Sequence, residues 1–182
     1  RHTVHTWNRT HSIADPLAAL GIAVHATVAE AVRQADIVVS LLENGPAVEH
    51  VLFHAGAAQA MRPGTLFIDM ASIQPREARD HAARLGEMGL AHLDAPVSGG
   101  TVGAENGTLA IMAGGRAEDF ARAQPVFAAL GRATHVGPHG SGQLAKLANQ
   151  MIVGITIGAV AEALLFAAKG GADMAKVREA IP

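Results

Sequence analysis

Three polar side chains near the end of this sequence have the types and the spacing that carbonyl chemistry uses. Lys146, Asn149 and Gln150 stand at positions i, i+3 and i+4 of a run that favours helix, so all three project from one helix face. A lysine that snorkels to water near a helix start would fit the same pattern, but two neutral amides beside it favour a polar pocket. A desolvated ammonium in such a pocket is suited to donating a proton to a carbonyl oxygen.

A second stretch, HLDAPVSGGTVGAENGTLAIMAGG (residues 92–115), combines six glycines with one serine that precedes a glycine pair. In open α/β sheets, ligands bind beyond the carboxyl ends of the strands. Bare backbone at Ser98, Gly99 and Gly100 lets a small anion approach the N–H groups closely, and the hydroxyl adds a further donor. A flexible loop would not need a serine held at a strand end, so we expect a binding surface.

A third stretch, VHTWNRT (residues 4–10), reads as a strand that ends in Asn8, Arg9 and Thr10. In a dinucleotide-binding fold, the second strand ends at the adenosine ribose, where an acidic residue favours NAD and an arginine accommodates the 2′-phosphate of NADP. A polar loop with a surface arginine is the simpler explanation of these residues taken alone. The glycine fingerprint that would decide between the two belongs upstream of this sequence.

Short β-rich runs alternate with alanine-rich helical runs along most of the chain. This alternation predicts an α/β fold with a Rossmann-type, doubly wound and mainly parallel sheet that is covered by helices on both faces. The predicted strands are 4–7, 23–26, 37–42, 66–70, 92–95, 109–113 and 133–136. The predicted helices are 13–20, 28–34, 46–60, 75–88 and 118–130, the last with a kink or break at Pro125.

From about residue 142 to 169 the sequence predicts one helix, far longer than the mean of about 11–12 residues. It is apolar on nearly every face, which is typical of a helix that is buried on every side. Gly170 and Gly171 end it before a further helix. We therefore expect an NAD(P)-binding domain over residues 1–139 and the start of a helical substrate or dimerisation domain over residues 140–182, in a chain truncated at both ends.

The composition limits the class of protein. Apolar residues make up 49% of the chain and charged residues 16%, so a sizeable core is expected. The formal net charge of −2 argues against a nucleic-acid surface. The sequence has no cysteine, which excludes disulfides and thiolate metal sites and suits a cytoplasmic protein. Glu162 inside the longest apolar run, without a flanking basic cluster, argues against a membrane span.

No metal site is predicted. His50 and His54 lie at i and i+4 of a predicted helix, but no third ligand is evident, so a solvated helix face is the better explanation. His135 and His139 share this spacing, but a Gly-Pro pair between them excludes a helix. Asp69 ends a strand and is expected to bind its own loop rather than act as a base.

Taken together, these motifs resemble the β-hydroxyacid dehydrogenase family, which includes 3-hydroxyisobutyrate dehydrogenase and tartronate semialdehyde (2-hydroxy-3-oxopropionate) reductase. The matching segments cover nearly the whole chain and are NRT (8–10), DAPVSGG (94–100) continuing into GTLAIMAGG (107–115), GSGQLAKLANQ (140–150) and EALLFAAKGGAD (162–173). The resemblance implies an NAD(P)-dependent oxidoreductase, leaning toward NADP, that transfers hydride between the cofactor and a short β-hydroxyacid or semialdehyde with a carboxylate.

The resemblance also implies roles for individual residues. Lys146 would be the catalytic acid. The substrate would be held by Ser98, Gly99, Gly100, Asn149 and Gln150, and the cofactor would be contacted by Asn8, Arg9, Thr10, Leu41, Leu42 and Ser72. Many relatives carry Asn four residues after the lysine, where this sequence has Gln150, and many carry Pro where Glu43 stands. We expect a homodimer or homotetramer of the full-length protein, because the apolar helix needs more partners than this chain supplies.

Two alternatives stay open. A 6-phosphogluconate dehydrogenase-like enzyme would share the lysine mechanism, although the sequence LANQMIVGITIG after Lys146 lacks the residues characteristic of that enzyme. A non-catalytic member of the fold, working as a cofactor-binding or assembly module, would typically lack the lysine. Imine reductases share the fold and generally lack it too.

Overall fold

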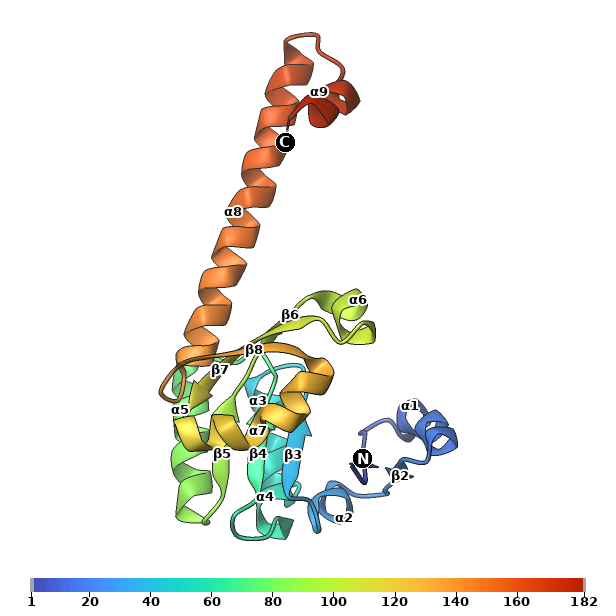
Figure 1. Cartoon of the computed structure of the whole chain (residues 1–182), viewed down its shortest axis with the longest axis vertical. Coiled ribbons are helices and arrows are strands. Elements are labelled where there is room, and N and C mark those ends of the chain that lie inside the picture. The colour runs from blue at the N-terminus through green and yellow to red at the C-terminus, as the bar shows by residue number, and fades with distance from the viewer. Residues whose placement is uncertain (1, 182) are drawn as a thin grey trace. The chain divides into compact units, whose positions relative to one another are not determined.

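The computed structural model describes residues 2–181 and divides into two compact units, one up to Lys146 and one from Leu147. Strands alternate with helices, as predicted (Figure 1). The strands are β1 (His5–Thr6), β2 (Ala23–Val24), β3 (Ile37–Ser40), β4 (Leu66–Asp69), β5 (Ala91–Asp94), β6 (Val97–Ser98), β7 (Leu109–Gly115) and β8 (Gly131–Gly137). The helices are α1 (His11–Ala14), η1 (Asp15–Leu20), α2 (Val28–Val32), α3 (Gly45–Glu49), η2 (His50–His54), α4 (Ala57–Ala60), α5 (Pro75–Glu87), α6 (Gly100–Glu105), α7 (Ala117–Leu130), α8 (Ser141–Lys169) and α9 (Met174–Ala180).

The main sheet has six strands, in the order β3-β4-β5-β7-β6 with β8 on the free side of β7. The pairs β3–β4, β4–β5 and β7–β8 are parallel, whereas β7 runs antiparallel to β5 and β6. The mainly parallel sheet is therefore confirmed, and its two antiparallel pairs are those that β7 makes with β5 and with β6. In the register, Asp69 of β4 pairs with Asp94 of β5, so these two carboxyl groups end neighbouring strands.

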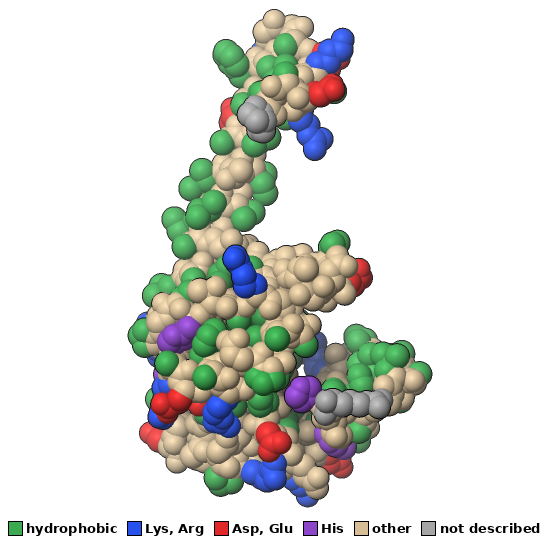
Figure 2. Space-filling model, in the orientation of Figure 1, with side chains coloured by type: hydrophobic (Ala, Val, Ile, Leu, Met, Phe, Trp, Pro, Cys, Tyr) green, Lys and Arg blue, Asp and Glu red, His purple; other side chains and the backbone are tan. Residues whose placement is uncertain are grey.

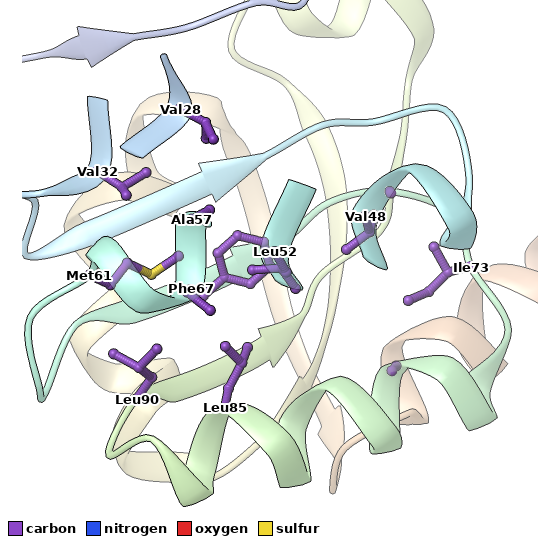
Figure 3. Packing of buried hydrophobic residues seen from close by; sticks show 13 residues of the cluster. Val28, Val32, Val48, Leu52, Ala57, Met61, Phe67, Ile73, Leu85 and Leu90 are labelled. Carbon is purple, nitrogen blue, oxygen red and sulfur yellow. The ribbon is translucent and has the colours of Figure 1, made fainter. Parts of the chain in front are cut away.

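Both faces of the sheet are covered, because side chains of the buried strands alternate between two hydrophobic clusters. Phe67 of β4 belongs to a cluster with residues of α2, α3, η2, α4 and α5, where Leu52 and Leu85 pack around it (Figure 3). Its neighbours Leu66 and Ile68 belong to a second cluster with α7, which crosses the other face (Figure 1). The doubly wound architecture follows directly from this alternation.

Strands β1 and β2 form a separate parallel pair, in which His5 is in register with Ala23. Among the described residues no strand joins this pair to the main sheet.

Several predicted elements have different limits. The helix expected over 13–20 is α1 followed by the 3₁₀ helix η1. The one expected over 46–60 is α3, which continues into the π-helical η2, and then α4, which Gly56 with φ +83° separates from η2. Helix α7 continues through Pro125, which lies on an exposed face where water can satisfy the carbonyl that proline leaves free. Strand β6 and helix α6 were not predicted at all.

Helix α8 is confirmed as one long helix, but it is not buried on every side. Its most apolar window of 18 residues has a mean hydropathy of 2.1 and no buried share, so by length and composition alone it would also suit a membrane span. Hydrophobic side chains lie along it (Figure 2), and Phe166 is 82% exposed. The described residues alone do not supply the cover that so apolar a helix needs in water.

Candidate active site

The predicted anion surface lies where β6 turns into α6. Ser98 is the last residue of β6 and is in register with Ala110 of β7. Gly99 and Gly100 follow with φ of +137° and +63°, a backbone region that other residues rarely adopt. A Cβ on Gly99 would also come within 3.1 Å of Cδ2 of Leu109. Both glycines are exposed, so the chain carries bare backbone at this strand end, as predicted.

A buried carboxylate connects the strand before this surface to the start of α8. Asp94 is fully buried; its Oδ1 accepts a hydrogen bond from the Gly140 backbone N–H at 2.8 Å, and its Oδ2 accepts one from the Gln143 N–H at 3.0 Å. Burial raises the pKa of Asp94, and these two donors oppose that shift. Gly142 packs so closely that a Cβ would overlap backbone oxygens of Asp94 and Met112. The end of β5 thus fixes the first turn of α8.

Lys146 lies one turn further along α8 and is half-buried. It is the last residue of the first unit, so its place on the anchored turn is part of that unit. Asn149 and Gln150 belong to the second unit, where the Asn149 Nδ2 donates to Oε1 of Gln150 at 3.3 Å. The joint placement of the three side chains around one substrate remains a prediction.

Gln143, which the sequence analysis did not single out, fixes the loop after β4. Its side chain is 1% exposed; Oε1 accepts from the Ile73 N–H at 3.0 Å and Nε2 donates to the Ala71 carbonyl at 2.9 Å. These two bonds flank Ser72, which is exposed. The amide therefore connects the start of α8 to the loop that carries a predicted cofactor contact. In the sequence, only the place of a polar amide at the start of an otherwise apolar helix could have indicated that Gln143 has a structural role.

Asp69 binds its own loop, as predicted. Its Oδ1 accepts from the Ala71 N–H at 3.0 Å and from the Ser40 hydroxyl at 3.1 Å, which joins the ends of β3 and β4. Its Oδ2 is buried without a hydrogen-bond partner among the described residues. Burial raises the pKa of Asp69 to about 7, so this carboxyl group is partly protonated at neutral pH.

The remaining predicted cofactor residues follow the carboxyl ends of β1 and β3. The Asn8 Oδ1 accepts from the Thr10 N–H at 2.8 Å, which forms a tight turn with Arg9 exposed at its centre. After β3, Leu41 is 69% exposed, whereas Leu42 packs against the hydrophobic core. The strand ends thus present an exposed cation and an exposed apolar side chain, while Leu42 supports the loop from inside.

The sequence analysis missed a histidine pair in which one ring is fully buried and the other half-buried. His92 is 2% exposed and lies with its ring centre 5.6 Å from that of His139. Burial lowers the pKa of His92 to about 3, so its ring is neutral at pH 7. His139 had been matched with His135 by spacing, but His135 instead bonds the Gly115 carbonyl at 2.9 Å. No local signal reveals a pair that forms between a strand and a distant loop.

A shallow charged groove, also not predicted, lies between α3 and α5. Its lining residues are Gly45, Pro46, Glu49, Arg76, Glu77, Asp80 and His81. Within it the buried His81 Nε2 lies 3.2 Å from Oε2 of Glu49, which also accepts from Arg84 at 2.9 Å. Glu49 of α3 thus contacts two side chains of α5, one of them a histidine whose pKa is lowered by burial.

A doubly wound sheet with candidate ligand residues after the carboxyl ends of β1, β3, β4 and β5 defines a nucleotide-binding domain of the dehydrogenase type. Two family models match the chain: the NAD binding domain of 6-phosphogluconate dehydrogenase over residues 1–138, and the NAD-binding domain of NADP-dependent 3-hydroxyisobutyrate dehydrogenase over residues 140–182. The chain belongs to the NAD-binding β-hydroxyacid dehydrogenase family.

Individual relatives agree with this assignment. The chain is 45% identical over 171 residues to 2-hydroxy-3-oxopropionate reductase of Escherichia coli K12, covering 93% of this chain and 59% of the relative. It is 40% identical to the NAD-dependent L-serine dehydrogenase of Pseudomonas aeruginosa, covering 94% and 58%. The structure of Mycobacterium tuberculosis 3-hydroxyisobutyrate dehydrogenase with L-serine superposes with a TM-score of 0.89 at 38% identity, covering 93% and 58%. The chain thus spans less than two thirds of each relative.

Proposed function

We propose that the full-length protein is an NAD(P)-dependent oxidoreductase that interconverts a short β-hydroxyacid and its semialdehyde, as a 2-hydroxy-3-oxopropionate reductase or a 3-hydroxyisobutyrate dehydrogenase. One observation carries the proposal. The two hydrogen bonds that Asp94 accepts from Gly140 and Gln143 join the strand leading to Ser98 and its glycines to the helix turn that carries Lys146. In this proposal the same joint supports both the carboxylate cradle and the proton donor.

The chain's own residues would act in a defined order. Backbone N–H groups at Gly99 and Gly100 with the hydroxyl of Ser98 hold the substrate carboxylate. When bound beside this cradle, a reduced nicotinamide would supply the hydride for the carbonyl carbon. Lys146 donates a proton to the carbonyl oxygen, so that the aldehyde becomes an alcohol. In the oxidative direction the same amine accepts the proton from the hydroxyl.

The residues at the strand ends fit a dinucleotide. The exposed Arg9 in the turn after β1 suits the 2′-phosphate of NADP, and Ser72, held between the two bonds of Gln143, suits a cofactor contact after β4. We therefore favour NADP, with Asn8, Thr10, Leu41 and Leu42 as further contacts. The relative named as an NAD-dependent dehydrogenase makes this preference a matter for direct measurement.

The domain arrangement follows the same logic. We propose a cofactor domain over residues 1–139 and a helical domain beginning at 140, in which further helices or a second subunit, rather than lipid, cover α8. The support is that a dehydrogenase family model spans this helix over residues 140–182. Such a protein would be a cytoplasmic homodimer or homotetramer. A stable monomer of the full-length protein in sedimentation would contradict the subunit contact.

The test of the activity uses the full-length protein with NADPH and NADH. Their oxidation is followed with tartronate, methylmalonate and succinate semialdehydes, beside a measurement of cofactor affinity. Turnover of at least one of these supports the proposal and identifies the substrate class. Tight cofactor binding without turnover of any would favour the non-catalytic module, against which the presence of Lys146 argues.

A further inference from the structure

Two histidines and one aspartate, side chains of the types that ligate metals, meet where β5 ends against the loop before α8. His92 and Asp94 stand two residues apart in β5, so both side chains project to the same face of the sheet. His139 reaches them from the loop between β8 and α8. One donor atom from each of the three side chains lies within 4.8 Å of the other two, and of the described residues only these three form such a group.

The histidines of this group have unused nitrogen atoms. Both ring nitrogens of His92 and Nδ1 of His139 are buried without a hydrogen-bond partner among the described residues. A buried polar atom left unpaired costs about 1–3 kcal/mol, so an arrangement with three such atoms side by side calls for a ligand. An imidazole nitrogen without a proton is a metal donor, and each carboxylate oxygen of Asp94 accepts one N–H bond and keeps a second lone pair.

Two glycines and a second carboxyl group border this group of side chains. Gly114 and Gly115 end β7 beside the group, and a Cβ on Gly114 would lie 2.7 Å from Oδ1 of Asp94, one on Gly115 3.2 Å from Cε1 of His139. The register partner of Asp94 is Asp69, whose Oδ2 is also unpaired, so two buried carboxyl groups lie on neighbouring strands. A divalent cation would attract both.

We propose that His92, Asp94 and His139 bind one Zn²⁺ ion per chain. Two imidazoles and one carboxylate form a donor set that suits Zn²⁺, with water as the fourth ligand of a tetrahedron. Ligands at about 2.0–2.2 Å from the metal lie about 3.3 Å apart, so the donors close in by roughly 1 Å each on binding. His139 is half-buried on a loop between Gly137 and Gly140, which gives the ion access and lets this ligand move.

The ion would act as a clamp on the proposed active site. It would bind β5 to the loop that enters α8, in parallel with the two hydrogen bonds of Asp94. Lys146 follows in the next turn of that helix, so the metal would stiffen the frame that positions it. Zn²⁺ takes no part in the proton or hydride transfer in this assignment, and the proposal stands independently of the substrate.

The test is a titration of the metal-free full-length protein with ZnCl₂, read by calorimetry and by the shift in thermal unfolding. We compare wild type with His92→Leu and with His139→Ala. Removing even an outer-shell partner of a metal lowers its affinity about 10–100-fold, so each of these ligand variants should lose more than about 100-fold. His92→Leu also removes two unpaired buried nitrogens, so without metal it should unfold no earlier than wild type.

Surface histidine pairs provide the matched control. His5 bonds His25 at 2.9 Å, and His50 stacks on His54 at 5.9 Å between ring centres. His5 and His50 are exposed, His25 is half-buried, and the side chain of His54 is 65% exposed. The double variant His5→Ala/His50→Ala should therefore keep one tight site and its thermal stabilisation by Zn²⁺. Co²⁺ bound to the wild type should give the visible bands of a tetrahedral site, and these should vanish in His92→Leu.

Two results would overturn the proposal. One is Zn²⁺ binding that is lost in the surface double variant but kept in His92→Leu. The other is wild-type protein that shows neither binding nor thermal stabilisation at micromolar Zn²⁺, in which case His92 and His139 are a neutral packed pair.

Discussion

The amide of Gln143 offers a sharp test of how the start of α8 is fixed. Gln143→Met keeps nearly the same side-chain volume but removes the bonds to the Ile73 N–H and to the Ala71 carbonyl. Because the side chain is 1% exposed, water does not replace these partners without a rearrangement. The variant therefore leaves two buried backbone groups unpaired on either side of Ser72.

The expected loss in the free energy of unfolding follows from these two backbone groups. Each unpaired backbone group costs about 1–3 kcal/mol, giving about 4 kcal/mol for the pair. Burial of the methionine side chain in place of a polar amide returns about 1 kcal/mol. The free energy of unfolding should thus fall by about 3 kcal/mol, a large part of a typical 5–15 kcal/mol.

Urea unfolding of the full-length protein measures this loss as a lower midpoint at an unchanged slope. Gln124→Met is the matched control, because Gln124 is an exposed helical residue of α7. Cofactor affinity should also fall in Gln143→Met, since the loop with Ser72 loses its support, and stay unchanged in the control. A midpoint shift for Gln143→Met no larger than that of the control would refute the structural role of this amide.

Three further changes test neighbouring features. The Asp69 carboxyl group has a pKa of about 7 in the folded protein against 3.8 in the unfolded chain, so between these values only the folded protein keeps the proton. The free energy of unfolding should therefore fall by about 4 kcal/mol between pH 4 and pH 8. Urea midpoints measured across this pH range should lose this component in Asp69→Asn. Gly142→Ala places a Cβ against two backbone oxygens and should lower the free energy of unfolding by more than about 3 kcal/mol in the same assay. The control Gly86→Ala meets open space in α5 and should be neutral or stabilising by up to about 1 kcal/mol. Equal effects of the two substitutions would contradict the close packing at the start of α8. Arg9→Ala should weaken NADPH binding by about tenfold or more while leaving NADH nearly unchanged, and a parallel loss of both in fluorescence titrations would contradict the contact to the 2′-phosphate.

Local periodicity predicted most of the fold. Strand Leu66–Asp69 is fully buried, and its three apolar residues alternate between the two clusters as a doubly covered strand requires. The break of the expected 46–60 helix depends on a π-turn and on the positive φ of Gly56, which composition does not reveal. Strand β6 has two residues and exists only because β7 folds back against it, so no local pattern could predict it.

The candidate site was predictable where function needs an unusual local residue and not where it needs a distant partner. Gly99 and Gly100 stand out in the sequence because their backbone conformation excludes other residues. The hydrogen bonds that Asp94 accepts from Gly140 and Gln143 join residues more than 45 positions apart, so no local sequence pattern could predict them. The same holds for His92 and His139, which only the fold brings together.

The most direct test of the account is the kinetics of Lys146→Ala in the full-length protein, beside Lys169→Ala at the exposed far end of the same helix. A proton donor contributes about 10²–10⁴-fold to the rate, so Lys146→Ala should lower kcat by that factor and keep its affinity for NADPH, whereas Lys169→Ala should leave both unchanged. A Lys146→Ala enzyme that reduces the semialdehyde within about threefold of the wild-type rate, a difference of well under 1 kcal/mol in barrier height, would contradict the central claim.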